Sequence, residues 1–242
     1  MSAESFEVRP DGGRALSGSD AAAYGDDTIF WNVDTQYDFM RPDGNLPVGE
    51  GEGAEDIEDA LAEVTRTARA NGIRVVNTAD YHNKDSAEFS EDPDFEETFP
   101  PHCLAGSEGA EYVPATQPEN PMEIDWREDA DWAEVMEHEG DFVLYKDAFD
   151  VFAGEPESPH AEQLVETLDP DRAVVYGVAT DVCVDYAVEG LMDQGVDVYV
   201  VEDAVKGIDP DNSAEAINRW EDKGATIGTT EGLNEYLEGG VL

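Results

Sequence analysis

The sequence predicts an α/β fold in which helices cover both faces of a mainly parallel β-sheet. Six short apolar runs are typical of buried strands, and amphipathic helical periods separate most of them. The apolar runs are 28–33, 73–78, 142–145, 173–178, 196–201 and 225–228, and the helical periods are 57–70, 161–168, 182–194 and 213–223. Because alternating strands and helices are joined by right-handed crossovers, the arrangement is a three-layer α/β/α fold.

The helical periods begin and end where such a fold requires. The first one places Leu61, Val64 and Ala68 on a single face, as in a helix that packs on a sheet. Gly72 follows it, and Gly195 follows the third period, each at the position where a glycine commonly ends a helix. We therefore expect these helices to return the chain to the start of the next strand.

The 242 residues suffice for one α/β domain and are too few for two. Residues 1–26 show no stable period, which predicts an N-terminal tail or arm followed by a single domain over 27–242. The exception to the alternating pattern is an acidic, proline-punctuated insertion at about 81–141 without a strong strand signal. A segment of that length inside a compact domain is more often functional than idle.

The net charge of −46, from 13 basic and 59 acidic side chains, excludes two classes of partner. Nucleic acid and anionic membranes would be repelled, because their phosphates need cationic side chains. A folded chain with this self-repulsion needs screening, which indicates a halophilic protein. The sequence has no membrane-spanning apolar run and no leader, and its two cysteines predict reduced thiols, so we expect a cytoplasmic protein.

Four predicted strands end at residues with reactive side chains. Asp34 follows the first, Asp80 and His82 the second, Lys146 the third, and Cys183 opens the helix after the fourth. Ligands bind outside the carboxyl ends of parallel strands, so these residues are expected at one rim. A helix N-terminus and a nearby ammonium group favour a thiolate, which predicts a lowered pKa and a nucleophilic role for Cys183.

Five segments resemble motifs of one family in that family's order. They are Asp34-Thr-Gln-Tyr-Asp-Phe39, Asp80-Tyr-His82, Phe99-Pro-Pro-His-Cys103 followed by Gly106 and Gly109, Lys146, and Gly177-Val-Ala-Thr-Asp-Val-Cys-Val184. Across roughly 27–232, the chain resembles the nicotinamidase and isochorismatase-like superfamily of cysteine hydrolases. The resemblance implies the isochorismatase-like hydrolase fold, with a six-stranded parallel sheet.

The resemblance also assigns roles to individual residues. It implies a catalytic triad of Asp34, Lys146 and Cys183, and an oxyanion hole made by the backbone N–H groups of Ala179 and Cys183. The bond between Val178 and Ala179 is expected to be cis. A divalent metal ion would be bound by Asp80, His82 and His102, with Glu88 as a further ligand; zinc is favoured, and iron or manganese are alternatives.

These residue types support hydrolysis of a small amide through a thioester, with release of ammonia. Nicotinamide is the favoured substrate, and Phe39 and Phe99 are expected either to sandwich its ring or to pack in the core. Another small amide or a carbamoyl compound is the alternative, because Phe99 and Tyr81 replace tryptophans usual in nicotinamidases. A non-catalytic metal-binding protein on this fold is a third reading. As partners we expect only the small-molecule amide and further copies of the chain in a homo-oligomer.

Overall fold

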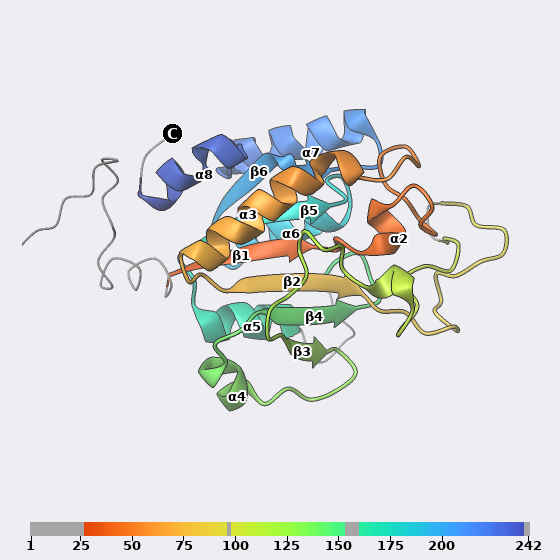
Figure 1. Ribbon diagram of the computed structural model, residues 1–242, viewed down its shortest axis with the longest axis horizontal. Helices are drawn as coiled ribbons and strands as arrows, with labels where there is room; N and C mark the ends of the chain where they lie inside the picture. The colour runs from red at the N-terminus through yellow and green to blue at the C-terminus, as the bar shows by residue number, and fades with distance from the viewer. Residues whose placement is uncertain (1–26, 96–97, 153–159, 240–242) are drawn as a thin grey trace, which may run out of the picture.

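The computed structural model describes residues 27–95, 98–152 and 160–239, and its strands form one sheet (Figure 1). The six predicted strands are β1 (Thr28–Val33), β2 (Val75–Asp80), β4 (Phe142–Lys146), β5 (Arg172–Val178), β6 (Asp197–Lys206) and β7 (Thr226–Gly228). The strand order is β3-β4-β2-β1-β5-β6-β7, and each neighbouring pair is parallel. The predicted fold class is therefore confirmed, with one strand more than expected.

The additional strand is β3 (Met122–Asp125), which corrects the predicted count of six to seven within the described residues. It lies at the edge of the sheet and pairs only with β4. Of its four residues only Ile124 is buried, because an edge strand has a single neighbour to cover it. Such a short and largely polar pattern gives no clear strand signal.

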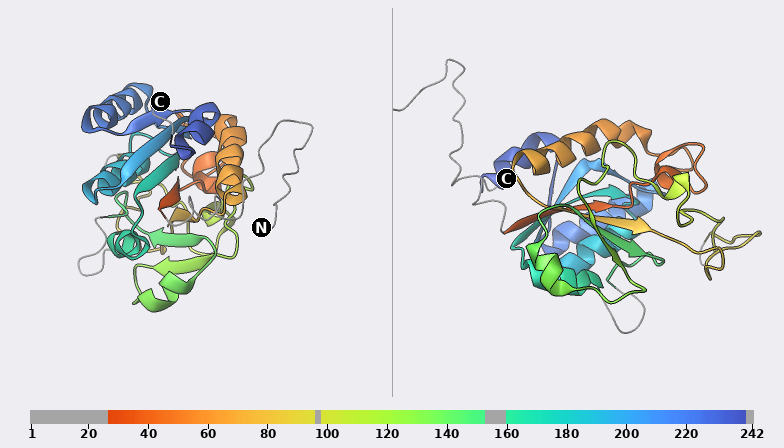
Figure 2. Two further views of the ribbon diagram at one scale, coloured as in Figure 1. Left: turned by 90° about the vertical axis from the view of Figure 1, so that its left-hand side faces the viewer. Right: turned by 60° about the horizontal axis from the view of Figure 1, so that its bottom comes forward.

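Helices cover both faces of the sheet, as the left panel of Figure 2 shows. One face carries α3 (Glu58–Ala70) and α8 (Thr230–Leu237), and the other carries α4 (Trp132–Glu137), α5 (His160–Leu168), α6 (Cys183–Asp193) and α7 (Pro210–Lys223). Side chains alternate along β1, so that Phe30 packs with the α3 face and Trp31 with the α6 face. The sheet thus has a separate apolar core on each side.

The parallel strands all end at the same edge of the sheet, where the site forms. Beyond the arrowheads of β1, β2 and β4 lie α2 (Tyr37–Met40), η2 (Glu108–Ala110) and part of the acidic insertion (Figure 1). The short helix η1 (Glu55–Ile57) precedes α3. The predicted tail over 1–26 lies outside the described residues. Within those ranges, no helix is both long and apolar enough to cross a membrane.

Candidate active site

Four of the five predicted rim residues come together at the carboxyl ends of the central strands, and the fifth, His82, lies in a neighbouring cluster. Asp34 follows β1 directly and adopts a left-handed backbone conformation, with φ of 46°. Asp80 and Lys146 are the last residues of β2 and β4 and are direct partners in the parallel register. Cys183 is the first residue of α6, as the sequence predicts. Strand ends and one helix start therefore deliver two carboxylates, an amine and a thiol to one place.

The ammonium group of Lys146 is the centre of this cluster. Its Nζ lies 2.8 Å from Oδ2 of Asp34 and 3.7 Å from Sγ of Cys183, and it also forms an ion pair with Asp80. All four side chains are buried. The other oxygen of Asp34 accepts a hydrogen bond of 2.6 Å from the Thr78 hydroxyl, which fixes the plane of the carboxylate. The arrangement holds a base and a thiol beside a common cation.

Burial shifts the titration of this cluster, and it corrects the predicted thiol pKa. Burial raises the pKa of Cys183 well above its usual value; Lys146 opposes the rise, while Asp34 and Asp80 add to it. The predicted lowering is therefore wrong, because the site is enclosed and holds two carboxylates for one ammonium. Burial also raises the pKa of Asp34 against the effect of Lys146, so this carboxylate is a stronger base than an exposed aspartate.

The backbone before α6 offers two N–H groups to the same site. The peptide bond between Val178 and Ala179 is cis, as the resemblance implies. The carbonyl of Ala179 accepts hydrogen bonds from the N–H groups of Val182 and Val184, which anchor this turn to the start of α6. Within the described part of the chain, neither the Ala179 N–H nor the Cys183 N–H donates a hydrogen bond to a backbone carbonyl in the loops and turns around the site. Both groups are thus free to bind a substrate oxygen.

A second cluster, at the end of β2, contains the predicted metal ligands. Asp80, His82 and His102 are buried, and each places a ligand atom within 4.8 Å of the others. Oε1 of Glu88 lies 3.2 Å from Nε2 of His82 and 3.4 Å from Nε2 of His102. The chain leaves the sheet after Asp80, and His82 then pairs with Leu104, which turns its ring toward Asp80.

This donor set fits a divalent metal ion. Nε2 of His82 and Oε1 of Glu88 are buried and make no hydrogen bond, which is costly for polar atoms unless they have a ligand. The other ring nitrogen of each histidine has a partner: Nδ1 of His82 lies 3.2 Å from the Ser86 hydroxyl, and Nδ1 of His102 lies 2.9 Å from the Pro100 carbonyl oxygen. Partners of this kind orient imidazole ligands toward a metal. One carboxylate and two imidazoles suit zinc, iron or manganese.

Both clusters open into one cavity of about 650 Å³. Among the predicted site residues, those that line it are Asp34, Phe39, Asp80, Phe99, His102, Ala179 and Cys183. Phe39 and Phe99 each lie against the His102 ring, with centroids 5.4 Å and 6.4 Å away. The predicted aromatic pair is thus at the cavity, on the side of the metal cluster.

Sequence reasoning assigned no role to several residues that shape this site. The side chain of Gln36 bridges the backbone of Asp80, donating to its carbonyl and accepting from its N–H, both at 2.8 Å. Asp38 accepts a 2.7 Å hydrogen bond from the Cys103 N–H, next to His102. Phe149 meets Phe99 edge-on at 5.4 Å. Gln36 and Asp38 stand inside a quoted motif, and that motif was the only signal that could have indicated them.

Comparisons with known proteins found a matching family and several relatives. Residues 28–232 match the Isochorismatase domain family. The chain is 31% identical to the nicotinamidase/pyrazinamidase of Mycobacterium tuberculosis over 76% of its length and 89% of the relative's. It is 26% identical to the Escherichia coli nicotinamidase, over 81% and 92%. The crystal structure of the Pyrococcus horikoshii pyrazinamidase in complex with zinc superposes with a TM-score of 0.65 at 26% identity, covering 84% of this chain and 99% of that one.

Proposed function

Because the chain belongs to the isochorismatase family and is an amidohydrolase, we propose that it hydrolyses nicotinamide to nicotinic acid and ammonia, with Cys183 as nucleophile. The observation that carries the proposal is the position of Lys146 Nζ beside both Asp34 and Sγ of Cys183, two residues that line the cavity. A base, a thiol and a cation at these distances form the machinery for nucleophilic attack on an amide.

The reaction follows from the protonation states of these groups. The thiol of Cys183 is neutral at rest, so Asp34, whose pKa is raised by burial, takes its proton as the thiolate attacks the amide carbon. The carbonyl oxygen becomes an oxyanion held by the N–H groups of Ala179 and Cys183, each worth about 3 kcal/mol. The C–N bond then breaks, and Asp34 returns the proton to the departing ammonia.

The second half of the reaction removes the acyl group from the sulfur. Asp34 takes a proton from water, and the hydroxide attacks the thioester carbon. The C–S bond then breaks to give the carboxylic acid and the Cys183 thiolate, to which Asp34 returns the proton. Lys146 keeps its charge throughout, because Asp34 and Asp80 raise its pKa well above the usual value against the effect of burial. It stabilises the thiolate whenever that thiolate forms.

One divalent ion, with zinc favoured by the zinc complex of the Pyrococcus enzyme, would be held by Asp80, His82 and His102, with Glu88 adjacent. When bound, it would supply a positive charge that binds a ring nitrogen, a carbonyl oxygen or water. Phe39 and Phe99 would then flank a flat ring in the cavity.

Ammonia release from nicotinamide, in high salt with added zinc, iron or manganese, tests this function. We expect Cys183→Ala to lower the rate by three orders of magnitude or more, with folding intact because little volume is lost. Asp34→Asn should be comparably inactive, and the double variant hardly worse, since the two residues act as one unit. Cys103→Ala is the matched control, because that thiol is buried in the α3-side core. Equal rates for Cys183→Ala and the parent protein would rule out the thiol mechanism.

A further inference from the structure

The mouth of the active-site cavity gathers exposed apolar side chains. In the part of the chain that the structure describes, four large apolar residues are exposed: Phe95 (62%), Met136 (66%), Tyr186 (44%) and Ile208 (43%). Three of them, Phe95, Tyr186 and Ile208, line this one cavity. Single exposed apolar residues are ordinary, but their concentration at a cavity mouth marks a binding surface.

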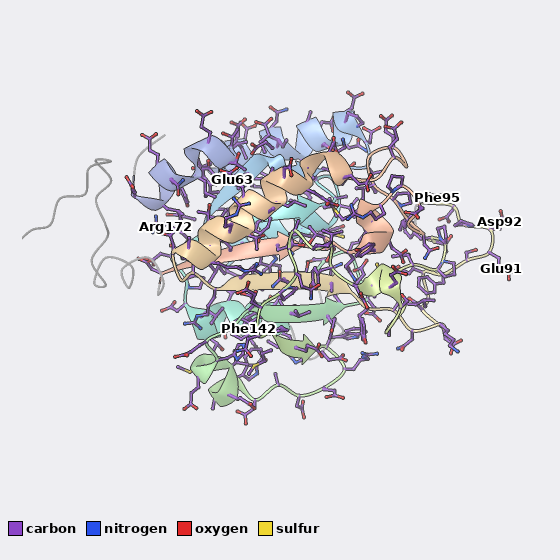
Figure 3. The ribbon with its side chains drawn as sticks, viewed as in Figure 1. Glu63, Glu91, Asp92, Phe95, Phe142 and Arg172 are labelled. Carbon is purple, nitrogen blue, oxygen red and sulfur yellow. The ribbon has the colours of Figure 1, made fainter. Side chains whose placement is uncertain are left out.

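These three residues, here called the apolar rim, are held in place by ring contacts, by a helix or by hydrogen bonds near the site. Phe95 meets Phe99 edge-on at 6.3 Å, and Phe99 meets Phe149 at 5.4 Å, so aromatic rings run from the mouth into the cavity. Figure 3 shows Phe95 beyond the ends of the strands. Tyr186 also lines the cavity and lies one helical turn after Cys183 in α6.

The carboxylates on the Ile208 and Tyr186 side of the mouth are already paired. Asp181 accepts hydrogen bonds of 2.8 Å from the N–H groups of Ile208 and Asp209, which fixes Ile208 at the rim. Asp185 binds Arg219 and accepts a 2.7 Å hydrogen bond from the Trp220 indole N–H. Both carboxylates therefore have hydrogen-bond donors within the protein, and Ile208 and Tyr186 supply apolar surface beside them. Glu50 is the other rim-side carboxylate in the lining.

The cavity is also larger than a single ring needs. Its volume of about 650 Å³ lies within the range of roughly 300–1,000 Å³ that is typical of sites for drug-sized ligands. Nicotinamide is one six-membered ring with a carboxamide. With that ring between Phe39 and Phe99, beside Cys183, the space up to the apolar rim is left for a further group.

We propose that Phe95, Tyr186 and Ile208 form an outer subsite that binds a neutral, apolar substituent on the ring of an aromatic amide substrate. This inference rests on the proposed function. It adds that the preferred substrates are nicotinamide-like amides that carry an apolar substituent on the ring. The subsite contributes affinity by burying apolar surface of the substituent against the rim.

The test compares kcat/KM for nicotinamide and 5-phenylnicotinamide, in high salt with added metal. In nicotinamide, C5 is meta to both the ring nitrogen and the carbon that bears the carboxamide. If the carboxamide faces Cys183 and the nitrogen faces His102, a 5-substituent therefore extends away from both residues. We expect the phenyl compound to be preferred about tenfold. Phe95→Ser and Ile208→Ser should each reduce this preference about fivefold. Met136→Ser, which removes an exposed apolar side chain outside the cavity, should leave it unchanged.

The outcomes separate the subsite from its alternatives. A preference for the phenyl compound that falls in both rim variants and persists in Met136→Ser supports the proposal. The absence of a preference, equal ratios in all variants, or a stronger preference for the cationic 5-aminomethylnicotinamide overturns it. Sedimentation of the same variants adds a further check. If the rim variants dissociate an oligomer while substrate preference stays constant, the rim is a contact between copies and the subsite is rejected.

Calorimetric binding to Cys183→Ala keeps the subsite distinct from the catalytic proposal. Suppose that the parent protein hydrolyses neither amide, yet Cys183→Ala binds 5-phenylnicotinamide more tightly than nicotinamide. If the additional Ile208→Ser change then abolishes this difference in affinity, the subsite stands and the proposed function fails. If nicotinamide is hydrolysed and its phenyl derivative binds no better, the function stands and the subsite fails.

Discussion

Lys146 is one ammonium group that serves three acidic partners. Asp34, Asp80 and the Cys183 thiol all lie against its Nζ in a buried site. Removing one partner from a buried ion pair costs about 3–5 kcal/mol, because the remaining charge has no compensation. Two carboxylates would lose their partner here at once. Lys146 is therefore expected to be important for stability as well as for the proposed chemistry.

We expect Lys146→Met to shift the alkylation of Cys183 to higher pH. The ammonium lowers the pKa of this thiol against burial and two carboxylates, so its loss raises that pKa further. Iodoacetamide labelling across a pH series, with Cys183 followed by peptide mass spectrometry, measures the shift. Lys84→Met, at an exposed lysine, is the control. Identical pH profiles for the two variants would contradict the proposed role of the ammonium.

Gln36 gives a second prediction about a single residue, concerning metal affinity. Its carboxamide donates to the Asp80 carbonyl through Nε2 and accepts from the Asp80 N–H through Oε1, whereas a carboxylate could only accept. Gln36→Glu loses the donor and places a negative charge beside the Asp80 carbonyl, so we expect about tenfold weaker metal binding. Elemental analysis after dialysis against graded chelator measures it. The exposed Gln194→Glu should bind metal normally; equal retention in both variants would exclude a positioning role for Gln36.

The two kinds of site residue differ in how far sequence predicts them. Asp34, Lys146 and Cys183 were predictable because strand ends of a parallel sheet meet at one edge, whatever the details of packing. Gln36 binds backbone atoms of a residue 44 positions away, and no local pattern encodes such a contact. The thiol pKa was predicted in the wrong direction because burial, which dominates it, depends on the whole fold.

At the scale of elements, β1 and β5 make a close contact where Val33, which precedes Asp34, pairs with Gly177, which precedes the turn before α6. Gly177 of β5 has a φ of 121°, and a Cβ there would lie 2.2 Å from the Val33 carbonyl oxygen. The two strands can keep their register at this point only with glycine. Gly195, after α6, also has a positive φ, of 83°, but a Cβ there would meet nothing within 4 Å.

These two glycines provide a matched pair of substitutions. Gly195→Ala should lower the free energy of unfolding by about 1–2 kcal/mol, the cost of a left-handed alanine. Gly177→Ala adds a collision with backbone, so we expect a loss of roughly 3 kcal/mol or more together with reduced activity, because β1 and β5 must separate. Urea unfolding at constant high salt compares them. Equal losses would show that β5 can shift without disturbing β1.

Element prediction was most reliable for the strands that have neighbours on both sides. Continuous apolar runs such as 173–178 indicated β5, whose residues are almost all buried. The edge strand β3 and the helix α4 lie in the acidic insertion, where each element buries a single residue, Ile124 and Val135. In this polar stretch, one buried residue per element is too few to produce a periodic signal in the sequence.

At the scale of the whole molecule, the net charge of −46 acts against folding. Figure 3 shows oxygen-tipped side chains along the outer sides of α3, α7 and α8, with Glu63 labelled on α3. The basic side chains are too few to neutralise them, and several already pair locally, as Arg219 and Lys223 do with Glu189. Repulsion among the remaining carboxylates extends over about 10 Å at 0.1 M salt but only about 3 Å at 1 M.

We expect the free energy of unfolding, measured in urea, and the amidase activity to fall as KCl is reduced from about 2 M to about 0.1 M, because screening offsets this repulsion.

Three exposed acids of α7 offer a control: Glu215→Gln, Glu221→Gln and Asp222→Asn together remove three negative charges. If screening is the cause, this variant should be more stable than the parent at low salt and nearly equal to it at high salt, where the charges are already screened. If salt instead acts by strengthening apolar burial, the parent and the variant should lose stability in parallel. Full activity and unchanged circular dichroism of the parent at 0.1 M salt would reject the halophilic interpretation of its composition.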